Sequence, residues 1–284
     1  MEEKIINIKD IEICTQGIGN PEDPCVLLIA GATVSMLFWD LEFCEKLANK
    51  GYFVVRFDFR DTGKSTHYPI GQVNYDIEDL VDDSIAILDY YKIDQAHLVG
   101  LSLGGMIAQI AALKYPQRVK SLTLMSTMPW AEVSIEIPEM DQRILTYHSQ
   151  VDSVDWNDED KVVEFMLSGE KLMSGQKALN LNRTESYIRN SFSRSKNFKN
   201  QFNHSSLSGA EQYYNQIQNI NCPVIVIHGT EDTICHFKYA GEIMRLTKAM
   251  RLFVLEGTGH ELHEDDWETI INAISSFVNY VENN

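Results

Sequence analysis

The 284-residue sequence predicts an α/β protein with a mostly parallel, eight-stranded sheet flanked by helices. Three observations favour this fold class. Short apolar runs alternate with segments of helical periodicity along most of the chain. The run at 25–30 is apolar throughout, as expected for a strand that helices cover on both faces. The alternation stops near residue 127 and resumes near residue 222, so we expect a helical insertion after the sixth strand.

The eight strands are predicted from two kinds of pattern. Alternating apolar and polar residues over 5–15 predict an antiparallel hairpin at one edge of the sheet. Apolar runs predict the other six strands, at 25–30, 52–57, 96–99, 121–126, 224–228 and 251–255. Helical spacing predicts the helices that cover the sheet, at 36–50, 77–91, 106–113, 237–246 and 267–278. Asp76 is the predicted N-cap of the second of these helices.

The break in this alternation divides the chain into a predicted core, 1–128 with 221–284, and a predicted cap, 129–220. Structureless loops of that length are uncommon in compact domains, so the cap is expected to be helical. It follows a strand of a parallel sheet, and ligands of open α/β sheets bind at the carboxyl ends of the strands. Five apolar residues are therefore candidates to line a substrate pocket, although each fits the core of the cap equally well: Met128, Trp130, Phe165, Met166 and Phe192.

Charge and composition limit the partners. The formal net charge of -17 disfavours nucleic acid and anionic membranes, because both require a basic surface. No stretch approaches the roughly 18–20 apolar residues of a membrane span, and the N-terminus lacks a signal-peptide pattern. The five cysteines are scattered, which favours free thiols in the cytoplasm. We expect a small-molecule partner, and the sequence leaves the oligomeric state open.

A Gly-x-Ser-x-Gly motif at residues 100–104 carries the strongest chemical signal. It lies between a predicted strand and a predicted helix, which is the context of a nucleophile elbow. In such a turn the serine, here Ser102, has a strained backbone and an exposed hydroxyl. A Cβ at Gly100 or Gly104 is expected to collide with the turn. An incidental serine in a glycine-rich turn is the alternative reading of the motif taken alone.

A nucleophilic serine needs a base, and the base needs an acid that orients it. Asp232 and His260 each follow a predicted parallel strand, as Ser102 does. The carboxyl ends of parallel strands meet at one edge of the sheet, so the three side chains are expected to lie there together. Serine, aspartate and histidine are thus the predicted catalytic residues.

Other residues compete for two of these roles. Glu231 is the rival acid, and Asp232 is preferred because it lies one residue deeper in the loop. His97 begins a strand and His228 lies within one, so neither is placed as His260 is. The oxyanion formed during ester cleavage also needs two backbone donors. The N–H after the nucleophile, at Leu103, and one in the loop after residues 25–30, at Ala32, are the candidates.

Two motifs resemble binding sites but lack the required spacing. Residues 63–65 read Gly-Lys-Ser, yet position 58, where a phosphate-binding loop has its first glycine, is aspartate. Residues 260–263 read His-Glu-Leu-His, with the two histidines three rather than four positions apart. The spacing therefore predicts neither a phosphate-binding loop at 58–65 nor a metal site at 260–263, and we expect no metal.

From residue 30 to residue 260 the sequence resembles the capped, serine-nucleophile branch of the α/β-hydrolase family. The likeness rests on Arg-x-Asp-x-Arg-Asp-Thr-Gly-x-Ser at 56–65, on Val-Gly-Leu-Ser-x-Gly at 99–104 and on Gly-x-Gly-His at 257–260. Within the family it resembles the aclacinomycin methylesterases, which act on the methyl ester of a bulky polyketide. The loop at 30–32 reads Ala-Gly-Ala and departs from the family's usual His-Gly signature.

The resemblance implies an α/β-hydrolase fold and carboxylic-ester hydrolysis through an acyl-enzyme, without a cofactor. A C–C bond hydrolase, a lactonase or a cofactor-free perhydrolase would use the same three residues. A small-ligand receptor with a hydrolase fold is the alternative outside catalysis. The expected substrate is an ester of a small apolar or bulky molecule.

Overall fold

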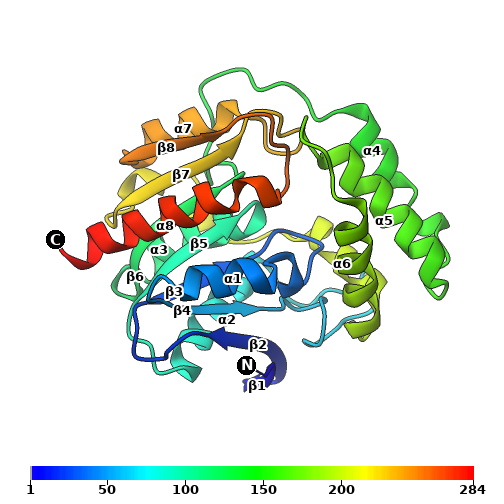
Figure 1. Cartoon of the computed structure of the whole chain (residues 1–284), viewed down its shortest axis with the longest axis horizontal. Helices are drawn as coiled ribbons and strands as arrows, with labels where there is room; N and C mark the ends of the chain where they lie inside the picture. The colour runs from blue at the N-terminus through cyan, green and yellow to red at the C-terminus, as the bar shows by residue number, and fades with distance from the viewer. Residues whose placement is uncertain (1) are drawn as a thin grey trace.

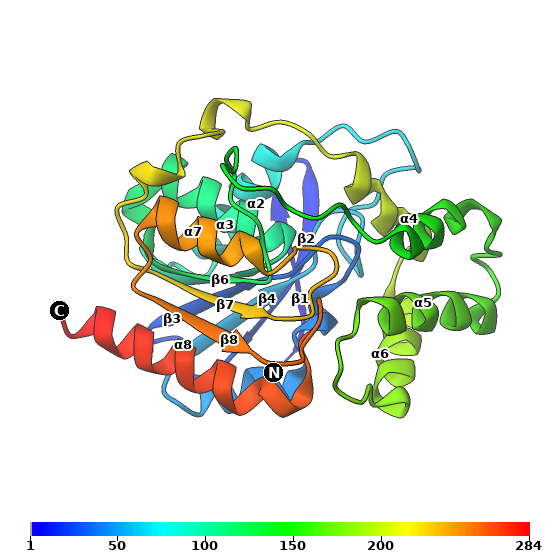
Figure 2. The ribbon, with the colours of Figure 1, turned by 90° about the horizontal axis from the view of Figure 1, so that it is seen from above.

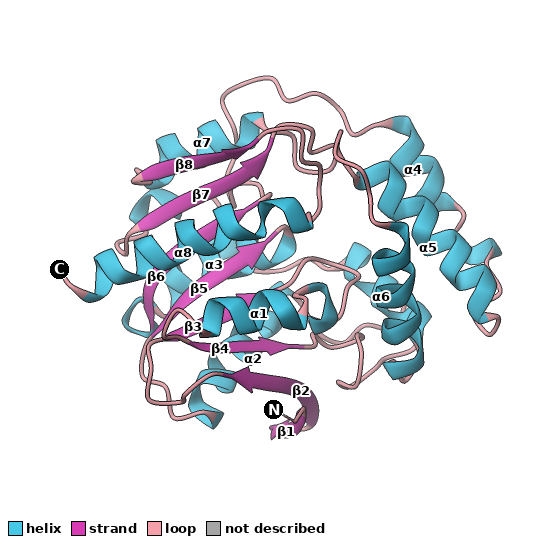
Figure 3. Cartoon of the chain, in the orientation of Figure 1, coloured by secondary structure: helices cyan, strands magenta, loops and turns pink. Residues whose placement is uncertain are grey.

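The computed structural model describes residues 2–284, which contain an eight-stranded sheet in the order β1-β2-β4-β3-β5-β6-β7-β8. Strands β1 and β2 are antiparallel to their neighbours, and the other six strands are parallel to one another (Figure 3). The predicted, mostly parallel sheet is therefore confirmed. Its strands are β1 (Lys4–Ile8), β2 (Ile11–Ile18), β3 (Cys25–Ile29), β4 (Phe53–Phe57), β5 (Ala96–Leu101), β6 (Val119–Met125), β7 (Val224–Gly229) and β8 (Arg251–Leu255).

Helices cover both faces of the sheet (Figures 1 and 2). One face carries α1 (Leu41–Ala48) and α8 (Trp267–Glu282), and the other carries α2 (Ile77–Tyr90), α3 (Leu103–Lys114) and α7 (Lys238–Thr247). Successive side chains of a strand point to opposite faces. In β3, Leu27 therefore joins one apolar cluster and Leu28 the other. This two-sided burial explains why β3 is apolar throughout.

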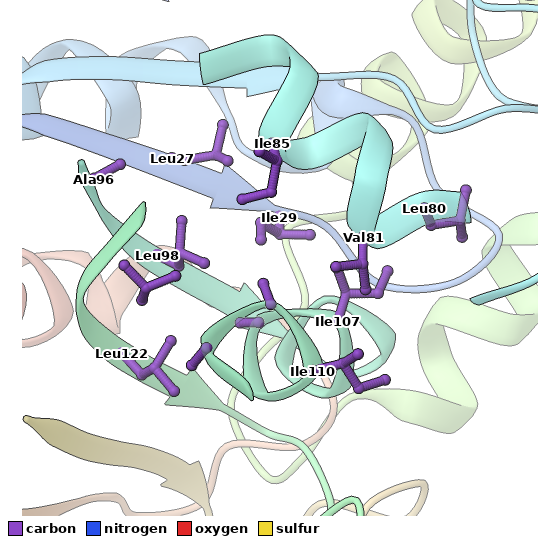
Figure 4. Close-up of a cluster of buried hydrophobic side chains, with 14 of the residues drawn as sticks. Leu27, Ile29, Leu80, Val81, Ile85, Ala96, Leu98, Ile107, Ile110 and Leu122 are labelled. Atoms are coloured by element: carbon purple, nitrogen blue, oxygen red, sulfur yellow. The ribbon is translucent and has the colours of Figure 1, made fainter. Parts of the chain in front are cut away.

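The cluster between the sheet and helices α2 and α3 fixes α3, the helix that follows Ser102 (Figure 4). Leu98 of β5, Val81 of α2 and Ile107 of α3 are fully buried in it. The predicted N-cap of α2 is confirmed, because the Asp76 carboxylate accepts the Asp79 N–H at 3.0 Å and Asp79 accepts that of Asp76. A cap of this kind contributes about 1 kcal/mol to helix stability.

The single helix predicted over 36–50 is wrong. The chain instead forms a 3₁₀ turn, η1 (Met36–Phe38), and then α1. The Ser35 hydroxyl accepts the Leu37 N–H, and the Asp40 carboxylate accepts the Glu42 N–H at 2.8 Å. Two N-caps so close together start two separate helices. The other 3₁₀ segments are η2 (Pro116–Arg118), η3 (Val151–Ser153), η4 (Phe198–Ser206), η5 (Glu211–Tyr213), η6 (Ile217–Asn219) and η7 (Glu264–Asp266).

The segment between β6 and β7, called the insertion below, contains α4 (Gln142–Ser149), α5 (Glu159–Met173) and α6 (Leu181–Arg194). These helices lie beyond the carboxyl ends of the parallel strands (Figure 1). They have an apolar cluster of their own, in which Tyr147 stacks on Phe165 with ring centroids 4.4 Å apart. None of the helices in the part of the chain that the structure describes is long and apolar enough to cross a bilayer.

Arg194, the last residue of α6, joins the insertion to the core. Its Nη1 lies 2.7 Å from Oδ2 of Asp58, and its Nε donates to Glu3 at 2.7 Å. Asp58 is fully buried and also accepts the backbone N–H groups of Met36 and Lys64. Burial raises the pKa of Asp58, and the Arg194 charge opposes that rise. Arg194 thus compensates a carboxylate that has no access to water.

Candidate active site

Ser102 lies in the turn between β5 and α3, with φ 54° and ψ −121°. This backbone conformation is strained for a residue with a side chain. A Cβ at Gly100 would lie 2.2 Å from the Gly104 carbonyl oxygen, and one at Gly104 would lie 2.2 Å from that of Ile29. The predicted collision at both glycines is therefore confirmed. The turn tolerates only glycine at these positions.

Ser102 lines a cavity of about 560 Å³ at the carboxyl edge of the sheet. The two predicted oxyanion donors line the same cavity: Leu103 as the first residue of α3, whose N–H has no partner within the helix, and Ala32 in the loop after β3. A Cβ at Gly31 would lie 3.4 Å from Cβ of Ser102, so this loop packs directly against the elbow. The remaining lining is mostly apolar: Ile77, Met106, Trp130, His204, Leu207, Ser208, Gly209, Glu211 and Tyr214.

Asp232 and His260 meet in the loops that follow β7 and β8. The Asp232 Oδ2 lies 2.8 Å from Nδ1 of His260, and its Oδ1 accepts the N–H groups of Ile234 and Cys235 at 2.9 and 2.7 Å. A carboxylate at Nδ1 requires the hydrogen on that nitrogen. Nε2 of His260 is then left with a free lone pair, the form that acts as a base.

Asp232 is buried, and three effects act on its pKa. Burial favours the neutral form, but the His260 ring nearby and the hydrogen bonds from His228 and His260 hold the pKa well below its ordinary value. Nε2 of His228 lies 3.5 Å from the carboxylate and 2.6 Å from the Cys235 carbonyl oxygen. Asp232 is therefore ionised at neutral pH and orients the imidazole of His260.

Glu231 points elsewhere. Its N–H donates to the Thr258 carbonyl at 2.9 Å, and its carboxylate lies 3.4 Å from the Thr230 hydroxyl. The carboxylate that contacts His260 is that of Asp232.

Cys235 links the nucleophile to the loop of the acid. Burial and the Asp232 charge raise the pKa of its thiol, and a hydrogen bond with the Ser102 hydroxyl opposes that rise in part. The Cys235 N–H in turn donates to Asp232. Ser102 therefore lies beside the loop that carries Asp232.

The five predicted pocket residues divide into three groups. Trp130 lines the cavity of Ser102, and its indole N–H donates to the Ala210 carbonyl at 3.2 Å. Met128 lines a neighbouring cavity with residues of the Asp232 loop. Phe165 and Met166 are buried in the apolar cluster of the insertion, and Phe192 packs against it. These three do not line the cavity of Ser102.

The insertion also contacts the loop that carries His260. The His260 N–H donates to the Met173 carbonyl at 2.8 Å, and the Gln176 N–H donates to that of Gly257 at 2.7 Å. Glu261 accepts the Gly175 N–H at 2.9 Å. The sequence offers no signal for these contacts, because they join groups far apart in the chain.

Two histidines near the site were not recognised as part of it from the sequence. For His228 the sequence does carry a signal of its place near the site, because it precedes the predicted acid Asp232 by only four residues. His204 has none: it comes from the insertion, and it lines the cavity while bonded to the loop after β3. No cluster of three or more His, Cys, Asp or Glu side chains that could hold a metal lies within residues 2–284.

A strand–Ser–helix elbow, a histidine–carboxylate pair and this sheet order together define a class of proteins. Residues 24–266 match the family model of the alpha/beta hydrolase fold, and the chain belongs to this family. The predicted fold class is thereby confirmed.

The chain is similar to two curated relatives. It is 42% identical over 125 residues to rhodomycin D methylesterase DauP of Streptomyces sp. (strain C5) and 39% identical over 125 residues to rhodomycin D methylesterase DnrP of Streptomyces peucetius. In both cases the match spans 44% of this chain and 42% of the relative. Among solved structures, esterase RhEst1 from Rhodococcus sp. ECU1013 superposes with a TM-score of 0.77 at 15% identity, covering 99% of this chain and all of that one.

Proposed function

We propose that the protein hydrolyses carboxylic esters through an acyl-enzyme formed on Ser102. The observation that carries the proposal is the 2.8 Å contact between Nδ1 of His260 and the buried Asp232 carboxylate, beside a strained serine that lines a cavity. A structural role does not require these three residue types at the carboxyl ends of three strands. The names of the two relatives support the same reaction.

In the proposed reaction, Nε2 of His260 removes the proton of the Ser102 hydroxyl as its oxygen attacks the ester carbonyl. Asp232 stabilises the imidazolium that forms. The N–H groups of Leu103 and Ala32 bind the negative oxygen of the tetrahedral intermediate. The alcohol leaves with the proton from His260, and a water activated by the same nitrogen then hydrolyses the acyl-enzyme.

We infer that the insertion acts as a cap that selects neutral, apolar esters. The cavity is lined mainly by apolar side chains, among them Trp130, Met106 and Leu207. Such a lining favours an apolar acyl or alcohol group. The net charge of -17 disfavours anionic esters through long-range repulsion. We place this activity in the cytoplasm, on the support of five free cysteines.

The test is hydrolysis of p-nitrophenyl and methyl esters of graded size, together with an anionic series, a lactone panel and a fluorophosphonate probe. Ester turnover and labelling by the probe are expected in the parent protein and absent in Ser102→Ala. Ser149→Ala, an exposed serine in α4, is the matched control and should behave as the parent. A folded Ser102→Ala variant with near-parental turnover would falsify the proposal. Lactone turnover without ester turnover would assign a different reaction to the same residues.

A further inference from the structure

His204 connects the insertion to the loop that carries one proposed oxyanion donor. It lies in η4, is only 5% exposed and lines the cavity of Ser102. Its Nδ1 lies 3.1 Å from the Thr33 backbone nitrogen, and its Nε2 lies 2.8 Å from the Arg60 carbonyl oxygen. One ring atom thus faces a donor and the other an acceptor.

These two partners specify the state of the ring. A backbone N–H can only donate, so Nδ1 of His204 is the acceptor, and the Arg60 carbonyl can only accept, so Nε2 carries the hydrogen. The neutral ring satisfies both bonds, whereas an imidazolium would direct an N–H against the N–H of Thr33. Burial lowers the pKa of His204, which maintains the neutral form. The bond to Thr33 is therefore a lasting feature of the folded protein.

Thr33 needs such a partner because its backbone is strained. Its φ is 60°, in the left-handed region, which a β-branched residue rarely adopts. A residue held there costs about 1–3 kcal/mol unless its surroundings impose it. The peptide group that the N–H of Thr33 belongs to also contains the carbonyl of Ala32. The bond from His204 therefore sets the orientation of the peptide group that follows Ala32.

Ala32 is one of the two proposed oxyanion donors, and its loop packs against Ser102. Because the Thr33 N–H donates to His204, it is unable to serve a substrate oxygen, which favours the N–H of Ala32 over that of Thr33 for this role. Donors stabilise a transition state only when their direction is fixed beforehand. We propose that His204 is a positioning residue for the oxyanion hole, supplied by the insertion, which fixes Ala32 through Thr33. This inference rests on the proposed ester hydrolysis.

The test compares three substitutions that differ in where they place an acceptor. The side-chain oxygen of Asn can replace Nδ1, that of Gln reaches only to the position of Nε2, and Phe keeps the ring without any acceptor. His204→Phe and His204→Gln are expected to lower kcat on p-nitrophenyl acetate by about 10- to 100-fold. This is less than the 10²–10³-fold loss on removing a donor outright, because the donor is misplaced rather than absent. His204→Asn should recover most of kcat.

A second readout separates positioning from packing. A trifluoromethyl ketone forms a tetrahedral oxyanion on the serine, so its affinity should fall in parallel with kcat, while KM for the ester changes little. His67→Phe is the matched control, since His67 lies in the neighbouring turn, contacts the Gly63 carbonyl and does not line the cavity. Its kcat should equal that of the parent.

Equal kcat losses in the Asn and Phe variants, or a parental kcat in the Phe variant, would overturn the inference. A melting temperature for each variant shows which are folded. If the Phe variant does not fold, the Asn and Gln variants, which differ by one methylene, decide alone. Absence of ester hydrolysis in the parent protein would overturn the proposed function and this inference with it. Hydrolysis by the parent together with unchanged His204 variants would overturn this inference only.

Discussion

Replacing Arg194 by Met should destabilise the protein strongly, because it leaves a buried carboxylate without its countercharge. The Arg194 side chain is 8% exposed and the Asp58 side chain is fully buried, with 2.7 Å between their charged atoms. Removing one partner of a buried ion pair costs about 3–5 kcal/mol. At about 2 °C per kcal/mol, as expected for a chain of this size, the melting temperature should fall by about 6–10 °C.

Arg189→Met is the matched control on the same helix. Arg189 lies 2.9 Å from each of three carboxylates, but its side chain is 38% exposed. Exposed ion pairs contribute little to stability, so its melting temperature should stay close to that of the parent. Thermal unfolding followed by circular dichroism measures both variants. Equal losses in the two, or none in Arg194→Met, would refute the reasoning from burial.

The pH dependence of the loss tests its cause. Burial raises the pKa of Asp58, and without Arg194 that rise is no longer opposed. A group with a raised folded-state pKa contributes stability at low pH and loses it as pH rises through that pKa. The deficit of Arg194→Met should therefore be smaller at about pH 5 than at about pH 8. A double variant with Asp58→Asn should recover part of the loss, because no unpaired charge remains.

Three further predictions concern the candidate site and the thiols. Asp232→Asn should lower kcat by about 10⁴-fold, which is the effect of a wrong histidine tautomer in a serine protease. Glu231→Gln should leave kcat within a few-fold of the parent value. Steady-state kinetics on one ester compares the two variants. Because the pKa of Asp232 is lowered in the folded state, its contribution to stability is present above the ordinary aspartate value of about 3.9 and is lost as pH falls below it. Asp232→Asn should accordingly flatten the acid limb of the stability curve, and an unchanged limb in acid titrations would contradict the assignment. Burial raises the pKa of Cys222 to about 12 and raises those of the other four thiols too, so Ellman's reagent at about pH 8 should label none of them until guanidinium unfolds the chain.

The sequence specified the sheet better than it specified the insertion. The parallel strands of the core are short and mainly apolar because helices bury both faces of the sheet, and that pattern is visible without a structure. Phe165 and Met166 have the same apolar character whether they line a pocket or pack within the insertion, and only the packing of α4 against α5 shows which. The periodicity of 36–50 likewise gave no sign that Asp40 divides the helix.

The sequence carries a signal for the part of the candidate site that depends on strand ends and none for the part that depends on contacts across the chain. Ser102, Asp232 and His260 each follow a strand, so the sequence predicts that they lie at one edge of the sheet, and the structure brings Asp232 and His260 into contact. His204 lies 171 positions from Thr33, and nothing in its own neighbourhood indicates that its ring holds that residue. Contacts of this kind follow from the fold of the insertion, which its weak and polar pattern does not specify.

The attachment of the insertion constrains how its specificity can change. Backbone bonds at 173–176 hold the His260 loop, and a side chain from η4 holds the loop after β3. The helices of the insertion could be exchanged for those of another family member to give a new binding surface. Such a chimaera should keep its catalytic rate only if it retains the contacts at 173–176 and the contact of His204 with Thr33. Loop grafts that ignore them alter rate and selectivity together. Helix α4 and the N-terminal half of α5 make neither of these contacts, so their sequences are free to diversify.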